Sequence, residues 1–251
     1  MKGIVLAGGH ATRLYPLTKV TNKHLLPVGR LPMIYYPIAR LLEGGIEDIL
    51  VVTSPDHMGD IVNLLGSGST LHVRFTYRVQ DAPGGIAQAL SLAEEFVGSD
   101  GCAAILGDNI YTRSFASIIR SFAESPRGAR ILLKSVSDPG RYGVAELSRD
   151  GKAILSIEEK PARPRSRLAV TGTYFYGHEV FQVIRTLKPS ERGELEITDV
   201  NNHYVRQGTM RWSEYEGEWT DAGTFASLLA ANNLVQDLPL PQVLAGLLDR
   251  R

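Results

Sequence analysis

The sequence has a single cysteine, Cys102, among its 251 residues. No disulfide bond can form within the chain, which excludes the small secreted domains that depend on disulfides, and a cytoplasmic location is the default expectation. Cys102 lies in the apolar run CAAIL, and a lone cysteine in such a run usually behaves as a small buried hydrophobic side chain.

Long apolar runs are also missing. None approaches the ~18 residues that a membrane-spanning helix needs, and the apolar start at residues 4–7 is too short for the core of a secretory signal. We therefore expect no membrane partner. The length allows one large α/β domain, and no linker, repeat or low-complexity segment divides it, so we predict one domain over residues 1–251.

Acidic residues are absent before Glu43, whereas six basic residues precede it: Lys2, Arg13, Lys19, Lys23, Arg30 and Arg40. A stretch with only positive charge suits a small polyanion, although a chance run of solvated side chains is the alternative. The formal net charge of the whole chain is zero, which argues against a protein that coats nucleic acid or an anionic membrane.

Strand-like and helix-like segments alternate along the first half of the chain. Strands are expected at residues 2–7, 48–53, 72–79 and 102–108, and helices at 34–43, 57–66 and 85–97. The second half has more strands, at 129–136, 143–147, 153–160 and 169–177, with helices at 178–187, 196–207 and 224–236 and a tail that suits a last helix. This order predicts an α/β fold with a mixed, mostly parallel central sheet flanked by helices.

The stretch LAGGHATRL follows the first predicted strand. It lacks the Lys-Ser/Thr of a P-loop and the spacing of G-x-G-x-x-G, so a dinucleotide site is disfavoured. What remains is a strand, a bend at Gly8 and Gly9, and Arg13, which can contact phosphate oxygens through its forked guanidinium. Lys23 can supply a second cation. The alternative is a tight turn that carries surface charges.

One acid stands where ligands of α/β sheets often bind, and a second candidate lies far along the chain. ILGDN ends a strand with Asp108, and the carboxyl edge of an open sheet is the usual ligand side. Asp108 suits Mg²⁺, which takes one or two carboxylates together with phosphate oxygens and water. Asp221, in WTDAGT, offers a second carboxylate. For either acid the alternative is a helix N-cap.

Other polar residues suit a base and a sugar. In QDAPGGIAQAL, Gln80 can present a donor and an acceptor to a base edge, and Gly85 permits close backbone approach, although a simple turn is the alternative. In IEEKP, strand alternation places Glu158 and Lys160 on one face, where they could hold a sugar hydroxyl and a phosphate or form only a surface ion pair. The histidines (His10, His24, His57, His72, His178 and His203) have no metal-ligand spacing.

Taken in order, these motifs resemble the sugar-nucleotide pyrophosphorylases, and most closely the short-type glucose-1-phosphate thymidylyltransferases. The matching segments run from residue 2 to about residue 236: KGIVLAGGHATRL, QDAPGGIAQAL, ILGDN, RYGVAE, IEEKP, VTGTYFY, RGELEITDVN and WTDAGT.

The resemblance implies one nucleotidyltransferase domain of Rossmann-like fold, with a nucleotide-binding amino half and a sugar-binding carboxyl half. It implies Mg²⁺-dependent conversion of dTTP and glucose 1-phosphate to dTDP-glucose and pyrophosphate, a step of sugar-nucleotide biosynthesis. The implied roles are catalysis for Arg13, Lys23 and Lys160, nucleotide binding for Leu6, Gly8, Gly9, Gln80, Gly85 and Asp108, metal binding for Asp108 and Asp221, and sugar-phosphate binding for Asn109, Gly143, Glu158, Lys160, Val170, Tyr174 and Arg192.

Two departures and two alternatives accompany the resemblance. Ala11 replaces the third glycine of the family's Gly-Gly-x-Gly-Thr-Arg pattern, and we expect a negative φ or a slight displacement there, with the loop still active. Longer members carry a regulatory carboxyl-terminal extension, so we expect weak or absent feedback of that kind.

A UTP-using uridylyltransferase and a catalytically silent nucleotide-sugar-binding homologue are the alternatives, and assembly into a homo-oligomer is compatible with the sequence.

Overall fold

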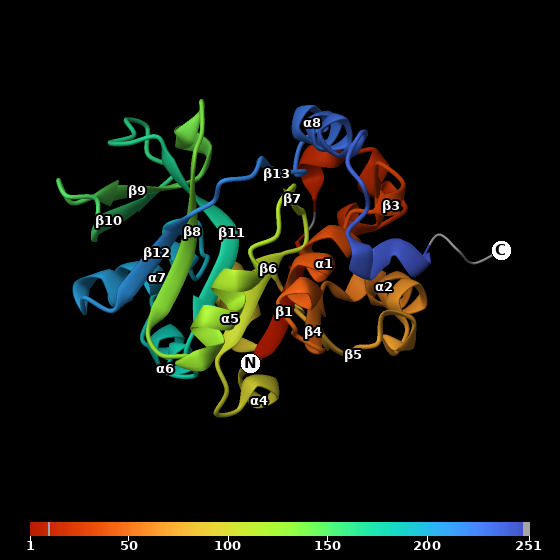
Figure 1. Ribbon diagram of the computed structural model, residues 1–251, viewed down its shortest axis with the longest axis horizontal. Coiled ribbons are helices and arrows are strands. Elements are labelled where there is room, and N and C mark those ends of the chain that lie inside the picture. Colours follow the sequence, from red (N-terminus) through yellow and green to blue (C-terminus); the bar gives the residue numbers. More distant parts are fainter. Residues whose placement is uncertain (10, 248–251) are drawn as a thin grey trace.

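The first apolar segment forms a central strand of a nine-stranded sheet (Figure 1). The computed structural model describes residues 1–9 and 11–247, so the interpretations of His10 and of the end of the tail lie outside the described residues. β1 (Lys2–Ala7) pairs in parallel with β4 (Asp48–Thr53) on one side and with β6 (Cys102–Leu106) on the other. β5 (Arg74–Val79) lies parallel to β4 at one edge.

The second half of the chain adds mainly antiparallel strands. β11 (Leu168–Tyr176) pairs antiparallel with β6, with β8 (Ala129–Ser135) and with β9 (Gly143–Leu147). β10 (Ile154–Glu159) is antiparallel to β9, and β12 (Met210–Glu214) is parallel to β8. Two short ribbons, β2 (Pro27–Val28) with β3 (Leu31–Pro32) and β7 (Asn109–Tyr111) with β13 (Trp219–Asp221), complete the strands. The predicted mixed α/β fold is confirmed.

Helices cover both faces of the sheet because β1 is apolar on both sides. Val5 packs in one cluster with residues of α1 (Tyr35–Glu43), α2 (Met58–Leu65), α5 (Ala116–Glu124) and α8 (Phe225–Val235). Ile4 packs in the other with α3 (Ile86–Ser91), α4 (Glu94–Val97), α6 (Val180–Arg185) and α7 (Ile197–Arg206), and buried Cys102 belongs to it. Within the described ranges, no helix has the length and apolar character needed to cross a membrane.

Two predicted helices differ in detail. The segment predicted as one helix over 85–97 divides into α3 and α4 at a turn around Leu92 and Ala93. The described part of the tail forms a 3₁₀ helix, Gln242–Leu247, anchored by the buried Leu244.

The parallel strands end at the same edge of the sheet. β1 runs into Gly8, β5 into Gln80 and β6 into Gly107. The chain continues from β1 to β4 on one side, whereas β6 lies on the other side of β1. At such a reversal of strand order the connections diverge and leave a crevice beyond the carboxyl ends of the strands. The fold thus opens a binding site between β1 and β6.

The loop after β1 contains a strained residue. Ala11 has φ 47° and ψ 36°, the left-handed conformation, so the expectation of a negative φ is wrong. The reason is local: Ala11 begins the 3₁₀ turn Thr12–Leu14, and its carbonyl accepts hydrogen bonds from the Leu14 amide and the Thr18 hydroxyl, both at 3.1 Å. Because Leu14 is fully buried, packing holds the turn in a conformation that alanine disfavours.

Buried polar groups fix the end of this loop. The Asn22 amide donates to the Ala7 carbonyl at 3.3 Å, and its Oδ1 accepts from the His24 backbone N–H at 2.9 Å. The same oxygen lies 2.6 Å from His24 Nδ1, so the proton of the neutral imidazole must sit on Nδ1. Burial, and then the neighbouring Lys23 ammonium, lower the pKa of His24 to about 3. A neutral histidine therefore holds the end of this loop through its hydrogen bonds with Asn22.

We predict that Ala11→Gly stabilises the protein. Glycine adopts the left-handed conformation without the clash of a Cβ atom, so the free energy of unfolding should rise by about 1 kcal/mol. Urea unfolding at neutral pH measures the change. Ala116→Gly, in the first turn of α5, is the control and should lower the free energy instead. An Ala11→Gly protein less stable than wild type would contradict the strain.

We predict that acid destabilises the protein partly through His24. Its pKa in the folded state lies below the ordinary value of 6.5, so its contribution to stability is full above pH 6.5 and is lost progressively as the pH falls toward 3. Between pH 7 and pH 5 this amounts to about 2 kcal/mol. His24→Gln should flatten the dependence of the unfolding free energy on pH, whereas the exposed-site change His72→Gln should leave it steep. Equal slopes in all three proteins would show that His24 does not titrate in this way.

Candidate active site

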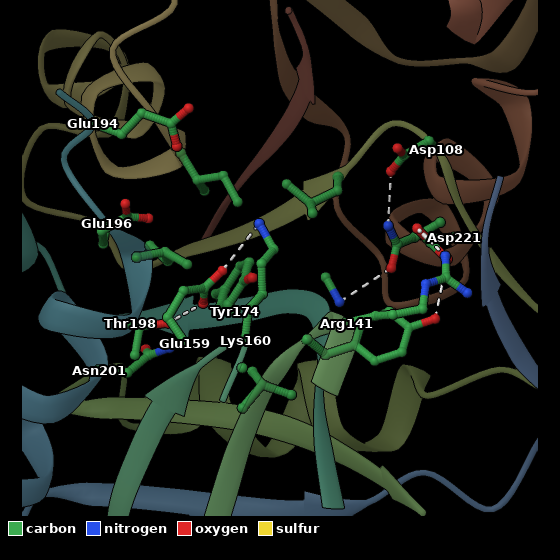
Figure 2. A pocket seen from close by; sticks show the side chains of 18 of the residues that line it. Asp108, Arg141, Glu159, Lys160, Tyr174, Glu194, Glu196, Thr198, Asn201 and Asp221 are labelled. Carbon is green, nitrogen blue, oxygen red and sulfur yellow. Dashed lines mark hydrogen bonds and ion pairs between the residues drawn. The ribbon is translucent and has the colours of Figure 1, made fainter. Parts of the chain in front are cut away.

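Two adjoining cavities open at the carboxyl edge of the sheet. The amino-half cavity is lined by Leu6, Gly8, Gly9, Arg13, Lys23, His24, Gln80, Pro83, Gly85, Ile86, Ala89, Leu106, Asp108 and Glu194. The carboxyl-half cavity (Figure 2) extends from Asp108 across β9 and β11 to α7 and to Asp221. Arg13, Ile86, Leu106, Asp108 and Glu194 line both. Two ligands could therefore meet at these shared residues.

The β7–β13 ribbon brings the two predicted metal ligands together. Asn109 is paired with Asp221 in its register, and the Ala222 amide donates to the Asp108 carbonyl at 2.8 Å. The helix-cap alternative is wrong for Asp221, because Thr224 caps α8 with a capping box. Asp108 is followed by β7 and caps no helix. A pairing between segments more than a hundred residues apart thus places both carboxylates at one point.

Arg13 lies at the same point. A Cβ atom on Gly223 would stand 3.1 Å from Arg13 Nη2, 3.4 Å from Asp221 Oδ2 and 3.6 Å from Asp108 Oδ2. The glycine therefore leaves open a space that one cation and two carboxylates border. A larger residue at position 223 would fill it.

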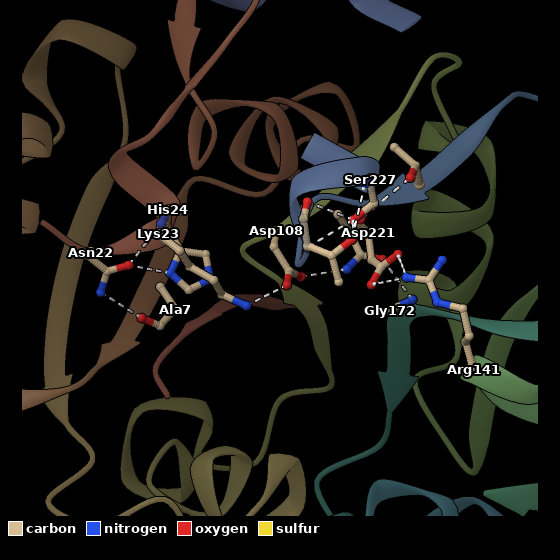
Figure 3. A network of polar contacts seen from close by, with 12 residues as sticks. Ala7, Asn22, Lys23, His24, Asp108, Arg141, Gly172, Asp221 and Ser227 are labelled. Atoms are coloured by element: carbon tan, nitrogen blue, oxygen red, sulfur yellow. Dashed lines mark hydrogen bonds and ion pairs between the residues drawn. The ribbon is translucent and has the colours of Figure 1, made fainter. Parts of the chain in front are cut away.

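Lys23 neutralises Asp108 (Figure 3). Its Nζ lies 2.5 Å from Asp108 Oδ2, and the Asn109 amide donates to Oδ1 at 2.9 Å. Burial alone raises the pKa of Asp108, but the Lys23 ammonium and these hydrogen bonds outweigh it and hold the pKa well below its usual range. Asp108 is therefore a carboxylate at neutral pH in spite of its burial.

Asp221 has a different environment. Tyr142 donates to its Oδ1 at 3.1 Å, and Arg141 Nη2 lies 3.2 Å from Oδ1 and 3.4 Å from Oδ2. Burial, and then the Asp108 carboxylate, raise its pKa, and Arg141 opposes them. Asp221 is thus the acid of the pair whose negative charge is less well compensated.

A hydrogen-bond network orients Asn109. Its Oδ1 accepts from the Trp219 indole at 2.6 Å and from the Gly172 amide at 3.1 Å. With its oxygen so fixed, the amide nitrogen of Asn109 faces Asp108. Sequence reasoning did not identify Trp219 as a site residue, although it lies two positions before Asp221 and lines the carboxyl-half cavity.

The predicted shared face of Glu158 and Lys160 is wrong. β10 ends at Glu159, and Lys160 has a left-handed backbone with φ 44°, so strand alternation stops before it. Glu159 and Lys160 line the carboxyl-half cavity, whereas Glu158 is exposed outside it. Glu159 accepts from Thr198 at 2.7 Å and lies 3.4 Å from Lys160 Nζ. The carboxylate that lines the cavity is therefore Glu159, one position after the predicted residue.

Gln80 and the glycines predicted around it meet in the amino-half cavity. A Cβ atom on Gly8 would lie 2.6 Å from Gln80 Oε1, so the Gln80 side chain would have to shift to admit it. Gly85 has φ 94°, and a Cβ atom there would lie 2.6 Å from the Leu195 carbonyl. The Gln80 amide nitrogen donates to Gln88 at 2.6 Å. The Leu195 backbone and the positive φ therefore require glycine at position 85, whereas the close approach of a ligand to these glycines stays a prediction.

The remaining predicted residues lie around the carboxyl-half cavity: Gly143, Val170, Tyr174 and Arg192. Val170 and Tyr174 come from β11 and are buried, whereas Arg192 precedes α7. The guanidinium of Arg192 lies 2.8 Å from Glu196 and 3.8 Å from Glu159. All predicted site residues except Glu158 therefore line one or both cavities.

The donor set suits a metal that shares its shell with a ligand. Within residues 1–9 and 11–247, no group of three or more His, Cys, Asp and Glu side chains could hold a metal ion alone. Asp108 and Asp221 contribute two carboxylates, and the repulsion between them falls when a cation binds. Mg²⁺ typically takes one or two carboxylates and completes its shell with water and phosphate oxygens, which this pair fits.

The chain is similar to proteins of known class. A family model described as nucleotidyl transferase matches residues 2–237. A glucose-1-phosphate thymidylyltransferase of Neisseria meningitidis is 46% identical over 240 residues, which cover 94% of this chain and 83% of the relative. The enzyme of the same name from Mycolicibacterium smegmatis is 44% identical over 245 residues, with coverage of 96% and 84%.

Solved structures of proteins with related names are also similar to this chain. A protein of Bacillus anthracis assigned as a glucose-1-phosphate thymidylyltransferase, crystallised with sucrose, superposes with a TM-score of 0.92 at 53% identity and covers 97% of this chain and 98% of its own. A UDP-glucose pyrophosphorylase complexed with UDP-glucose superposes with a TM-score of 0.81 at 24% identity, covering 92% and 97%, and shows the fold alone. The chain belongs to the nucleotidyl transferase family and is an enzyme of that family.

Proposed function

We propose that this protein converts dTTP and glucose 1-phosphate to dTDP-glucose and pyrophosphate. The observation that carries the proposal is the meeting of Arg13, Asp108 and Asp221 around Gly223, where the two cavities join. The relatives named for this reaction, 43–46% identical over at least 94% of the chain, support the choice of substrates.

The amino-half cavity suits the nucleotide. Gln80 carries an amide that can exchange hydrogen bonds with a pyrimidine edge, and Gly8 and Gly85 permit the backbone to approach a flat ring. Leu6 contributes its backbone and an apolar wall. The bend at Gly9 leads toward Arg13, so a triphosphate that extends from this cavity reaches the cationic end of the loop.

The carboxyl-half cavity suits the sugar phosphate. Glu159 offers carboxylate oxygens to sugar hydroxyls, and Val170 and Tyr174 supply a floor from β11. Asn109 lines the side nearer the acid pair, and Gly143 lies beside Glu159. Lys160 and Arg192 can neutralise the phosphate, which orients the attacking oxygen toward the shared residues.

The reaction is direct transfer between two anions. An oxygen of the sugar phosphate forms a bond to the α-phosphorus of the nucleotide, while the bond from that phosphorus to the bridging oxygen breaks and its electron pair leaves with pyrophosphate. Such transfers depend on positioning and on neutralising charge rather than on covalent catalysis. Arg13 holds the departing pyrophosphate, and Lys23 and Lys160 compensate the charge around the reacting phosphates.

Asp108 and Asp221 would hold Mg²⁺ in this proposal. When bound, the ion neutralises phosphate oxygens near the reacting centre. Lys23 keeps Asp108 ionised, and the Asn109 amide keeps its carboxylate oriented. Substrates of this kind are held inside the cell, so we also propose a cytoplasmic location. Assembly into a homo-oligomer stays a prediction.

We predict that dTTP with glucose 1-phosphate is among the best pairs in a substrate grid that measures the rate of pyrophosphate release. The grid combines dTTP, UTP, CTP and ATP with several hexose 1-phosphates, with and without Mg²⁺. UTP should be used less efficiently, because the missing methyl group is worth about 1–3 kcal/mol.

Asp108→Asn is the negative control, and it should lose at least a hundredfold in turnover while its circular dichroism stays that of wild type. A clear preference for UTP would favour the uridylyltransferase alternative. Release with no pair would favour the silent homologue, and near-wild-type turnover of Asp108→Asn would remove this acid from the metal site.

We predict that the adjacent acids Glu158 and Glu159 differ in function. Glu159→Gln should raise the KM for the sugar phosphate about tenfold or more, because it loses a charged acceptor inside the cavity. Glu158→Gln makes the same chemical change one residue earlier, outside the cavity, and should leave KM within twofold of wild type. Steady-state kinetics at saturating dTTP measures both. The opposite ranking would return the role to Glu158.

A further inference from the structure

The two acids of the site each carry a basic partner. Lys23 lies on Asp108 at 2.5 Å, and Arg141 lies across Asp221, with Nη2 at 3.2 Å and 3.4 Å from its two oxygens. Figure 3 shows Lys23 and Arg141 on opposite sides of the two acids. With both partners in place, each carboxylate has a cation beside it.

The two basic residues differ in freedom. The Lys23 side chain is 15% exposed and stands on a 3₁₀ turn packed beneath the loop after β1. The Arg141 side chain is 40% exposed and belongs to the last residue of a surface turn, Pro139–Arg141. An exposed ion pair is weak, since solvent screens it and the long side chain loses freedom in forming it. Arg141 is therefore the partner that can leave.

The backbone beneath Arg141 is held in place, whereas its side chain is partly exposed. The Lys160 amide donates to the Tyr142 carbonyl at 3.0 Å. A Cβ atom on Gly140 would lie 3.2 Å from the Pro161 carbonyl, so the proline- and arginine-rich loop 161–166 packs against the turn. The Arg141 guanidinium lies 5.4 Å from the centroid of the Tyr142 ring, within the range of a cation–π contact. Neither this loop nor Arg141 has a role in the mechanism above.

A divalent cation and Arg141 compete for Asp221. A cation on the Asp221 carboxylate would stand within a few ångströms of the guanidinium, where the two positive charges repel and compete for the same oxygens. Tyr142 donates a neutral hydrogen bond to Asp221 and can stay. The arginine, not the tyrosine, is thus the group that metal binding displaces.

We propose that Arg141 is the exchangeable counter-ion of Asp221: it neutralises this carboxylate before a divalent cation binds, and on displacement its guanidinium contacts the phosphate of the sugar substrate. The inference rests on the proposed function, in which Asp108 and Asp221 hold the metal. We infer that the displaced guanidinium contacts this phosphate because Arg141 lines the carboxyl-half cavity together with Lys160 and Arg192. The exchange keeps the acid pair compensated and delivers a cation to the phosphate when the metal arrives.

The test measures binding of Mn²⁺ alone, by the electron paramagnetic resonance signal of the free ion. Arg141→Gln should bind Mn²⁺ about fivefold more tightly than wild type, because it loses a competitor of the strength of an exposed ion pair. The same variant should raise the KM for glucose 1-phosphate about tenfold. Arg165→Gln removes the same charge from a pair with Glu146, away from Asp221, and should change neither quantity.

A crystal structure of the wild-type enzyme with Mn²⁺ separates displacement from a general charge effect. We expect the Arg141 guanidinium to lie beyond hydrogen-bond distance of Asp221. An Arg141→Gln protein with no gain in Mn²⁺ binding, or a Mn²⁺-bound structure that keeps the Arg141–Asp221 pair, overturns the exchange.

Asp221→Asn separates the two proposals. If this variant binds Mn²⁺ as wild type does, the metal site of the proposed function is wrong, and the exchange is wrong with it. If it loses Mn²⁺ binding while Arg141→Gln gains none, only the exchange is wrong.

Discussion

The structure depends on the compensation of two carboxylates that the fold forces together. Asp108 and Asp221 border one space, where burial raises the pKa of each carboxyl and the neighbouring cations oppose that rise. Lys23 and Arg141 provide that compensation within the chain. Because opposite charges at short range in a shielded cleft interact more strongly than in water, the same arrangement that tolerates two acids also suits two phosphorylated substrates and a divalent ion.

The backbone around this charge cluster is packed as tightly as the side chains of the cluster. Gly8, Gly85 and Gly223 stand where a Cβ atom would meet Gln80, Leu195 or Arg13. Ala11 shows the opposite case, since an L-residue is held in a left-handed turn by the burial of Leu14. Strain in the loop beside the site is therefore offset by packing in the core, a common arrangement at functional loops.

Much of the fold could be predicted from local pattern. The apolar segment at residues 2–7 and its counterparts at 48–53 and 102–106 are buried on both faces, which a parallel sheet covered by helices requires. The carboxyl ends of the strands predicted at 2–7, 72–79 and 102–108 led to Gly8, Gln80 and Asp108 as site residues. Where an irregular backbone interrupts the pattern, prediction failed: alternation cannot continue through Lys160, so Glu158 was chosen in place of Glu159.

The sequence by itself determined the chemical inventory: two acids, a loop with only basic charge, and glycines at the strand ends, all in an order that resembles one family. These features are local, since each depends on residue type and on neighbours within a few positions. Only the tertiary structure decided that Asp221 meets Asp108, that Trp219 orients Asn109, and that Arg141 covers Asp221. Those relations depend on the β7–β13 ribbon and on a turn beside it, and pairing between distant segments is set by the packing of the whole chain.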